Sequence, residues 1–210
     1  MTGKIAVITC GPAYAPIDSV RRITNFATGE IGTLLAEELS VLGWEVFCLR
    51  GEGCTAAPPQ AAKVLGFSTN ESLAAVLGTL PAETAAVFHA AALCDFEVAG
   101  ISGGDGRGKI SSRGGEISLR LRPAEKLLPK LRGFFPNAEI FGWKFECDGG
   151  REGALAAAKC QIEESGTNGC VVNGPAFGAG FGLLLPDGVL REFADKRSLA
   201  KALAAMVADS

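Results

Sequence analysis

The sequence predicts an α/β protein with a Rossmann-like, doubly wound and mostly parallel sheet that carries helices on both faces. Two observations predict this class. Short β-branched runs alternate with segments of helical periodicity through the first half of the chain. Hydrophobic residues make up 48% and charged residues 20% of the 210 residues, a composition typical of a globular protein. With no internal repeat and no linker, residues 1–210 are predicted to form a single domain.

The amino-terminal half contains four predicted strands, at 5–9, 45–49, 64–67 and 85–89. Apolar residues at helical spacing predict a helix over 31–42, which Gly43 ends. A second helix is predicted over 73–80, after a capping box made by Ser68 and Glu71.

The second half opens with a segment of a different kind. Residues 97–115 contain seven glycines and almost no apolar periodicity, which predicts a mobile glycine-rich flap. Alternation at 117–121 predicts a half-exposed strand, and Pro123 suits the first turn of a following helix. The remaining predicted elements are strands at 140–145 and 169–172, a helix over 151–164, a C-terminal β-hairpin around a turn at 186–188, and a helix over 199–207.

The composition excludes several classes of partner. A net charge of −3 gives no global reason to bind nucleic acid or an anionic membrane, and we expect neither. No apolar stretch approaches the roughly 18 residues that cross a bilayer. Seven scattered cysteines without a C-x-x-C pair, and a single histidine, argue against a zinc site and for reduced thiols. We therefore expect a cytoplasmic protein without a signal peptide.

The connection after the first strand, roughly residues 10–30, is a candidate phosphate site. Gly29 and Gly32 would let backbone N–H groups approach a phosphate at a helix N-terminus, but helix capping and tight helix–strand packing explain both glycines equally well. Arg21 and Arg22 lie in the same connection. They suit bidentate capture of a phosphate or carboxylate, or they are solvated surface charges.

Other candidates follow predicted strands, where open α/β sheets bind ligands. Asp95 comes after a strand that ends in small residues, and His89 in that strand is predicted to be packed rather than catalytic. Lys109, in the flap, either neutralises charge during phosphoryl or nucleotidyl transfer or is a solvated lysine. Trp143 either fills the core or stacks on a base. Asn173 either ends a strand with a turn or contacts a base edge.

Four segments together resemble the phosphopantothenoylcysteine synthetase family. Residues 16–29 resemble its P-I-D-x-V-R-x-I-x-N-x-S-S-G segment, and residues 91–96, A-A-L-C-D-F, resemble its A-A-V-x-D-[FY]. Gly108-Lys109-Ile110 resembles the start of its flap motif, and Val172-Asn173 resembles its late A-N. The order and spacing hold over nearly the whole chain.

Members of that family condense 4'-phosphopantothenate with cysteine in coenzyme A biosynthesis. A nucleoside triphosphate activates the carboxylate as an acyl nucleotidylate, and the cysteine amine then attacks. The resemblance therefore implies a phosphopantothenate–cysteine ligase that uses CTP or ATP with Mg²⁺ and needs no flavin. It also implies a homodimer.

The resemblance assigns roles to individual residues. Lys109 and Asn25 are the expected catalytic residues. The expected substrate contacts are Asn25, Ala91, Ala92 and Asp95, together with Arg21, which would reach into the partner's site. The expected nucleotide contacts are Gly29, Gly32, Trp143, Asn173 and, across an alignment gap, Lys159.

This chain departs from the family in its first loop, which reads C-G-P-A at 10–13 instead of S-G-G-T. Proline removes one N–H that could hold a phosphate. Three alternatives to the ligase therefore stay open: a Rossmann-like nucleotide-binding protein, a divergent paralogue without synthetase activity, and a ligand-binding relic of a larger protein. The missing G-x-G-x-x-G argues against a dinucleotide enzyme.

Overall fold

A computed structural model of the protein describes residues 3–102, 108–111, 113 and 115–209. Its central sheet has eight strands in the order β12-β11-β10-β9-β6-β1-β4-β5. The six strands from β10 to β5 are parallel, and β11 and β12 add an antiparallel hairpin at one edge. The strands are β1 (Ile5–Pro12), β4 (Glu45–Gly51), β5 (Lys63–Phe67), β6 (Ala86–Ala92), β9 (Glu139–Phe145), β10 (Gly169–Asn173), β11 (Phe181–Leu184) and β12 (Leu190–Phe193). The predicted mostly parallel sheet and C-terminal hairpin are confirmed.

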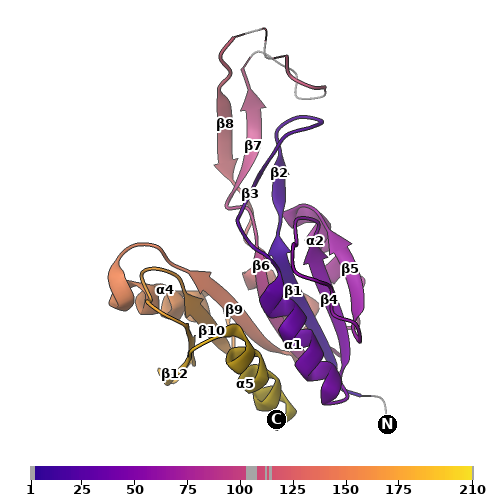
Figure 1. Cartoon of the computed structure of the whole chain (residues 1–210), viewed down its shortest axis with the longest axis vertical. Coiled ribbons are helices and arrows are strands. Elements are labelled where there is room, and N and C mark those ends of the chain that lie inside the picture. Colours follow the sequence, from indigo (N-terminus) through magenta and orange to yellow (C-terminus); the bar gives the residue numbers. More distant parts are fainter. Residues whose placement is uncertain (1–2, 103–107, 112, 114, 210) are drawn as a thin grey trace.

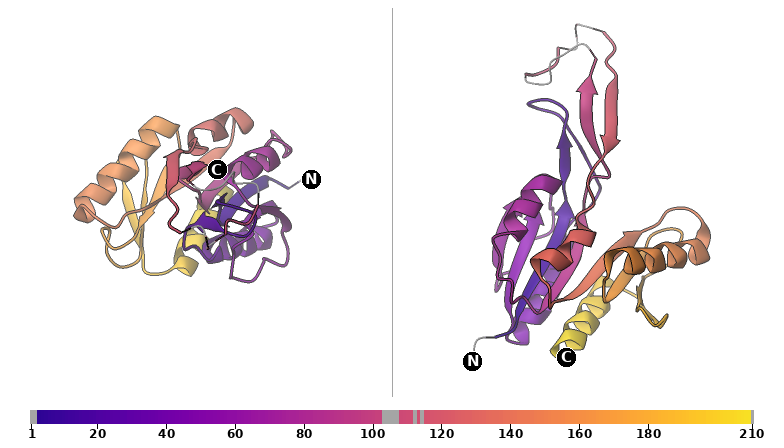
Figure 2. Two further views of the ribbon diagram at one scale, coloured as in Figure 1. Left: turned by 90° about the horizontal axis from the view of Figure 1, so that it is seen from above. Right: turned by 180° about the vertical axis from the view of Figure 1, so that it is seen from behind.

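Helices cover both faces of this sheet (Figures 1 and 2). One face carries α1 (Glu30–Val41) and α5 (Lys196–Ala208), and the other carries α2 (Asn70–Leu77), α3 (Leu131–Phe134), α4 (Gly150–Ser165) and the short 3₁₀ helix η2 (Leu128–Lys130). Alternate residues of the buried strands supply the two cores. In β1, for example, Ile8 packs under α1 and α5, and Val7 packs under α2 and α3. The predicted doubly wound arrangement is confirmed.

The capping box of α2 differs from the predicted one by one residue. Thr69, in an extended conformation, accepts a hydrogen bond from the Ser72 N–H at 3.1 Å, and the Ser72 hydroxyl accepts one from the Thr69 N–H at 2.9 Å. The prediction of Ser68 and Glu71 was wrong, because the helix is capped by Thr69 and the third residue after the cap is Ser72. The Ser72 hydroxyl also accepts a hydrogen bond from the Ser68 N–H. A serine therefore does what a glutamate usually does at this position.

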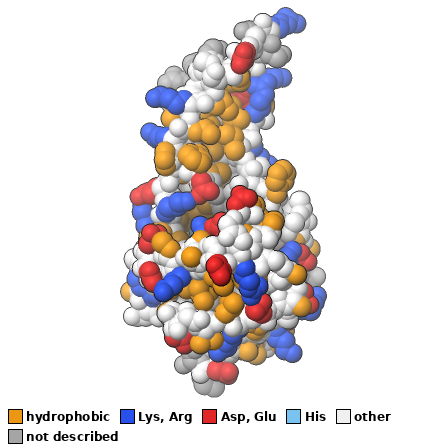
Figure 3. All heavy atoms as spheres, turned by 90° about the vertical axis from the view of Figure 1, so that its left-hand side faces the viewer, with side chains coloured by type: hydrophobic (Ala, Val, Ile, Leu, Met, Phe, Trp, Pro, Cys, Tyr) orange, Lys and Arg blue, Asp and Glu red, His pale blue; other side chains and the backbone are white. Residues whose placement is uncertain are grey.

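Two small antiparallel sheets extend beyond the carboxyl end of the central sheet and form an arm (Figures 1 and 2). One joins β2 (Tyr14–Pro16) to β3 (Arg22–Thr24), and the other joins β7 (Phe96–Ile101) to β8 (Leu119–Pro123). Hydrophobic side chains gather on the face of the arm seen in Figure 3. The exposed large hydrophobic residues of the arm include Val20, Phe96, Ile117 and Leu121.

The arm corrects three predictions. The connection after β1 contains the β2–β3 hairpin. The predicted flap begins with strand β7, because Val98 pairs with Leu121 of β8. Pro123 ends β8 opposite Phe96 and does not start a helix, since a strand end does not need its missing N–H. The mobility predicted for residues 97–115 stays a prediction, and residues 103–107, 112 and 114 of this segment lie outside the described residues.

No helix in the described part of the chain is long and apolar enough to span a membrane. All seven cysteines lie in that part and are free thiols, as predicted.

Candidate active site

Asn25 ties the connection after β1 to the end of β6. Its side-chain Nδ2 donates to the Leu93 carbonyl at 2.8 Å and to the Ala92 carbonyl at 3.4 Å. The Ala13 N–H donates to the same Ala92 carbonyl at 3.0 Å. The structure therefore brings Asn25 next to Ala92, one of the residues that the resemblance places in the same site. Asn25 is exposed, so its amide is oriented by the backbone and still open to a ligand.

Gly29 and Gly32 lie where α1 begins against β1. Gly29 has a φ of +78°, and a Cβ there would meet the Cys54 Sγ at 2.5 Å. A Cβ on Gly32 would meet the Cys10 Cβ at 2.3 Å. Packing thus requires both glycines, which was the alternative explanation left open by the sequence. The N-cap residue Gly29 has no side chain, and the Thr28 hydroxyl accepts only the Glu30 N–H at 3.3 Å, so other first-turn N–H groups suit an anion as well.

Two adjoining hollows, of about 450 and 490 Å³, flank this helix start. They share Glu30 and Leu34. Thr28, Thr33, Glu37, Thr55, Ala56 and Ala57 complete the first, and Phe181, Asp195, Lys196 and Arg197 complete the second. Lys196 forms a 2.5 Å ion pair with Glu30, which offsets the one acidic side chain in the first turn of α1. The hollows therefore offer hydroxyl groups, the two cations Lys196 and Arg197, and the carboxylates of Glu37 and Asp195 beside the helix N-terminus.

Arg50 shapes the first hollow, and sequence reasoning missed it. Its buried guanidinium donates to the Thr33 hydroxyl at 2.7 Å and to the Ala56 carbonyl at 2.5 Å. The Thr33 hydroxyl in turn donates to the Ala57 carbonyl at 2.8 Å. These bonds fix the loop after β4 against α1. The available signal was an arginine at the end of an otherwise apolar strand, where a buried charge needs partners.

Arg21 lies in the β2–β3 turn and is tied to the arm through Asp18. The buried Asp18 carboxylate accepts from the backbone N–H groups of Val20, Arg21 and Ile110 at 2.8–3.1 Å and pairs with the Arg21 guanidinium at 2.6 Å. The bond from the Val20 N–H is the largest cause that lowers the pKa of Asp18. Arg21 also donates to the Ile110 carbonyl at 3.3 Å. Asp18 therefore anchors the segment that carries the exposed Lys109.

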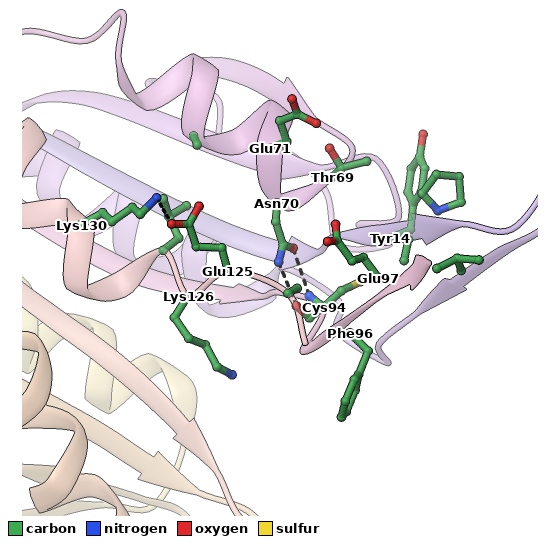
Figure 4. Close-up of a pocket in the computed structure, with 16 residues that line it drawn as sticks. Tyr14, Thr69, Asn70, Glu71, Cys94, Phe96, Glu97, Glu125, Lys126 and Lys130 are labelled. Atoms are coloured by element: carbon green, nitrogen blue, oxygen red, sulfur yellow. Dashed lines mark hydrogen bonds and ion pairs between the residues drawn. The ribbon is translucent and has the colours of Figure 1, made fainter. Parts of the chain in front are cut away.

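Asp95 follows β6 and is exposed, and its carboxylate pairs with Lys126. The residues on either side of it, Cys94 and Phe96, line a cavity of about 520 Å³ between α2, the arm and η2 (Figure 4). Asn70 fixes the Cys94 backbone there, with bonds of 2.8 and 3.1 Å. The predicted site residues do not line this cavity, so its size alone does not mark it as the site of the chemistry.

The predicted nucleotide contacts of the second half lie on different faces. Trp143 is half-buried and packs on the core under α1 and α5. Lys159 belongs to α4, on the opposite face, and is exposed, with Glu163 at 3.9 Å. Asn173 ends β10, where its carbonyl accepts the Glu146 N–H at 2.9 Å. The register of β9 and β10, which pairs Trp143 with Val171, puts Trp143 and Asn173 on the same face two residues apart. Lys159 lies away from both, and the roles of all three residues stay predictions.

His89 is a packed strand residue, as predicted. It is buried in β6, and its Nδ1 lies 2.8 Å from the Thr9 hydroxyl. Burial lowers its pKa to about 4, so the ring is neutral at pH 7.

Comparison with known proteins agrees with this arrangement. The model of the DNA/pantothenate metabolism flavoprotein C-terminal domain matches residues 1–208. The chain belongs to this family. The coenzyme A biosynthesis bifunctional protein CoaBC of Thermococcus kodakarensis is 29% identical over 176 residues, which is 82% of this chain. The chain spans only 42% of that relative's length.

Solved structures show the same fold for this DNA/pantothenate metabolism flavoprotein C-terminal domain. The DNA/pantothenate metabolism flavoprotein from Streptococcus pneumoniae superposes with a TM-score of 0.84 at 19% identity, covering 98% of both chains. A Cab2 mutant in complex with phosphopantothenate-cysteine superposes with a TM-score of 0.79 at 17% identity, covering 98% of this chain and 85% of the other.

The altered first loop of this family member continues the strand. β1 runs through Gly11 and Pro12, which pair with Ala91 and Ala92 of β6. Gly11 has a φ of +77°, and a Cβ there would meet the Cys54 Sγ at 2.0 Å. The Pro12 replacement therefore leaves β1 joined to the predicted substrate segment, and it removes one N–H from that edge.

Proposed function

We propose that this chain is a phosphopantothenate–cysteine ligase of coenzyme A biosynthesis. The observation that carries the proposal is the bond from Asn25 to the Ala92 and Leu93 carbonyls, which joins two of the family-like segments at the end of β6. The names of its relatives support the proposed pathway, and the bound phosphopantothenate-cysteine of the Cab2 structure supports the proposed substrates. We expect the reaction to take place in the cytoplasm and without flavin.

The proposed reaction has two steps. A carboxylate oxygen of 4'-phosphopantothenate attacks the α-phosphorus of CTP or ATP, and pyrophosphate leaves. The amine of cysteine then attacks the acyl carbon, the nucleoside monophosphate leaves and the amine loses a proton. Among the described residues, no group of three or more His, Cys, Asp or Glu side chains could hold a metal ion, so we propose that Mg²⁺ enters with the triphosphate.

The geometry suggests a role for each part of the site. The N–H groups at the start of α1 would hold phosphate oxygens, because the helix dipole favours negative charge there. Asn25, oriented by two carbonyls, would present its Oδ1 to a donor on the substrate. Lys109 would neutralise charge on the α-phosphate, and the bonds that join Ile110 to Asp18 and Arg21 hold its segment beside Arg21, so the two cations would act in the same site.

Pyrophosphate release tests this proposal and identifies the nucleotide. We expect release with either CTP or ATP that depends on 4'-phosphopantothenate. Without cysteine, release should stop near one equivalent, because the acyl nucleotidylate stays bound. The matched control is Asn25→Ala, which should bind nucleotide and release little pyrophosphate. A chain that binds nucleotide and releases no pyrophosphate with any combination of substrates would instead be a paralogue without synthetase activity.

We also propose that the ligase is a homodimer formed through the arm. The exposed side chains of Phe96 and Leu121 lie on one face of the β7–β8 sheet by their register, and hydrophobic side chains gather on the arm in Figure 3. Clustered apolar side chains of this kind mark a protein interface. The Arg21 side chain, 41% exposed, would complete the partner's site from this position. Mixing Arg21→Ala chains with Asn25→Ala chains should restore part of the activity. A monomer in sedimentation at micromolar concentration would contradict the proposal.

A further inference from the structure

Three thiols meet beneath the start of α1. Cys10 lies on β1, Cys48 on β4 and Cys54 in the loop after β4. The Sγ atoms of Cys10 and Cys48 are 4.0 Å apart, and the Cys54 Sγ lies 3.7 Å from the Cys10 carbonyl oxygen. The point where a Gly29 Cβ would sit is 2.5 Å from the Cys54 Sγ and 3.7 Å from the Cys10 Sγ. The proposed ligase reaction uses none of these sulfurs.

Access distinguishes the three thiols. Cys10 and Cys48 are completely buried, whereas Cys54 is half-buried. Cys54 also fills the gap between the end of β1 and the start of α1, because its sulfur occupies the space that a side chain at Gly11 or Gly29 would need. A reagent in solution therefore reaches Cys54 first, and the nearby Cys10 is placed to react next.

We propose that Cys54 and Cys10 form a thiol–disulfide exchange site for small disulfides, such as oxidised glutathione or cystine. In the first step the Cys54 thiolate attacks one sulfur of the small disulfide, and a mixed disulfide and one small thiol form. In the second step the Cys10 sulfur attacks the Cys54 sulfur. A Cys10–Cys54 disulfide forms, and the second small thiol leaves with the remaining proton. The small disulfide is thus reduced to two thiols as the protein pair is oxidised.

Access, and not acidity, gives the two steps their order, because the pKa values of both thiols are raised. The hydrogen bond with Cys10, together with burial, raises the pKa of Cys54, so the first step should accelerate as the pH rises. The hydrogen bond with Cys48 raises the pKa of Cys10 to about 12, and the same bond lowers the pKa of Cys48. The Cys48 Sγ, 4.0 Å from the Cys10 Sγ, is the neighbouring group that would share the Cys10 proton in the second step.

The bridge would also act on the start of α1. The Thr55 and Ala56 N–H groups, directly after Cys54, donate to the Thr28 carbonyl at 3.2 and 3.1 Å. Drawing Cys54 towards Cys10 shifts this loop and therefore Thr28, which lines the hollow beside the helix. We infer that the oxidised chain binds nucleotide more weakly, an inference that rests on the proposed function. Formation of the bridge does not depend on it.

The bridge can be tested in the full chain with Cys147→Ser and Cys160→Ser, which removes the two exposed thiols. After incubation with excess oxidised glutathione and alkylation, peptide mapping should find a Cys10–Cys54 disulfide that dithiothreitol reverses. Cys10→Ser should stop at glutathione on Cys54, and Cys54→Ser should give no bridge. Near-ultraviolet circular dichroism checks that each variant is folded. A Cys54 that stays fully alkylatable, or a bridge between Cys10 and Cys48, would overturn the proposal.

Nucleotide titration separates this inference from the proposed function. We expect at least tenfold weaker nucleotide binding in the bridged chain, restored by dithiothreitol. If the reduced chain binds no nucleotide, the ligase proposal fails while the mapped bridge stands. If the bridged and reduced chains bind equally well, the effect on the site is refuted.

Discussion

Replacing Gly32 by alanine tests whether packing or ligand binding requires that glycine. In an open helix interior, alanine stabilises by roughly 0.5–1 kcal/mol relative to glycine. Gly153 in α4 is such a position, because a Cβ there meets no atom within 4 Å. At Gly32 the new Cβ would lie 2.3 Å from the Cys10 Cβ, which is attached directly to the buried strand β1 and cannot rotate away. Overpacking of this kind costs about 1–3 kcal/mol.

We therefore expect Gly32→Ala to lower the free energy of unfolding by about 1–2 kcal/mol after its gain in helix propensity is subtracted. The matched control, Gly153→Ala, should raise it by about 0.5–1 kcal/mol. Urea unfolding followed by circular dichroism measures both, and the midpoints should move in opposite directions. If both variants are stabilised alike and Gly32→Ala loses only nucleotide affinity, the packing argument is refuted and close approach of a phosphate explains the glycine.

Three further outcomes follow from the site. Lys109→Met should leave nucleotide affinity nearly unchanged and slow single-turnover pyrophosphate release by about 10²–10³-fold, as for loss of one electrostatic donor. A wild-type rate in this variant would show that Lys109 is a solvated lysine without a catalytic role. Trp143→Ala should weaken nucleotide binding by about 1–3 kcal/mol if the base stacks there, whereas Trp143→Phe should largely retain the affinity. Unchanged nucleotide affinity in both variants would show that Trp143 only fills the core. His89 has its pKa lowered from 6.5 to about 4, so stability is present above pH 6.5 and is lost as the pH falls towards 4. Between pH 7.5 and 5 this loss should be about 2 kcal/mol in urea unfolding and absent in His89→Gln.

The sequence was sufficient for the central sheet because its buried strands carry strong local patterns. β1, β6 and β10 are mostly apolar runs with one polar residue each, and the Pro-Asp-Gly turn marks the last hairpin. The arm was harder to predict, because β7 and β8 pair across a glycine-rich segment and only β8 shows clear alternation. Local periodicity does not reveal a partner strand so far away along the chain.

Part of the candidate site was also predictable from local sequence patterns. Asn25 and Ala92 lie in recognisable segments, and the topology of a parallel sheet brings strand ends together. The sequence did not predict that Arg50 and Asp18 fix loops of the site, because this role comes from their burial and from hydrogen bonds to other segments of the chain. The cluster of Cys10, Cys48 and Cys54 depends on strand register and on a loop conformation that spacing does not specify.

Transfer of oxygen from the acid to the nucleotide tests the central claim most directly. In the proposed route, one carboxylate oxygen of 4'-phosphopantothenate becomes bonded to the α-phosphorus and leaves with the nucleoside monophosphate when cysteine attacks. With substrate labelled by ¹⁸O in the carboxylate, mass spectrometry should therefore find one ¹⁸O in the nucleoside monophosphate and none in pyrophosphate. Label in inorganic phosphate, with nucleoside diphosphate as product, would show an acyl phosphate instead and contradict the account.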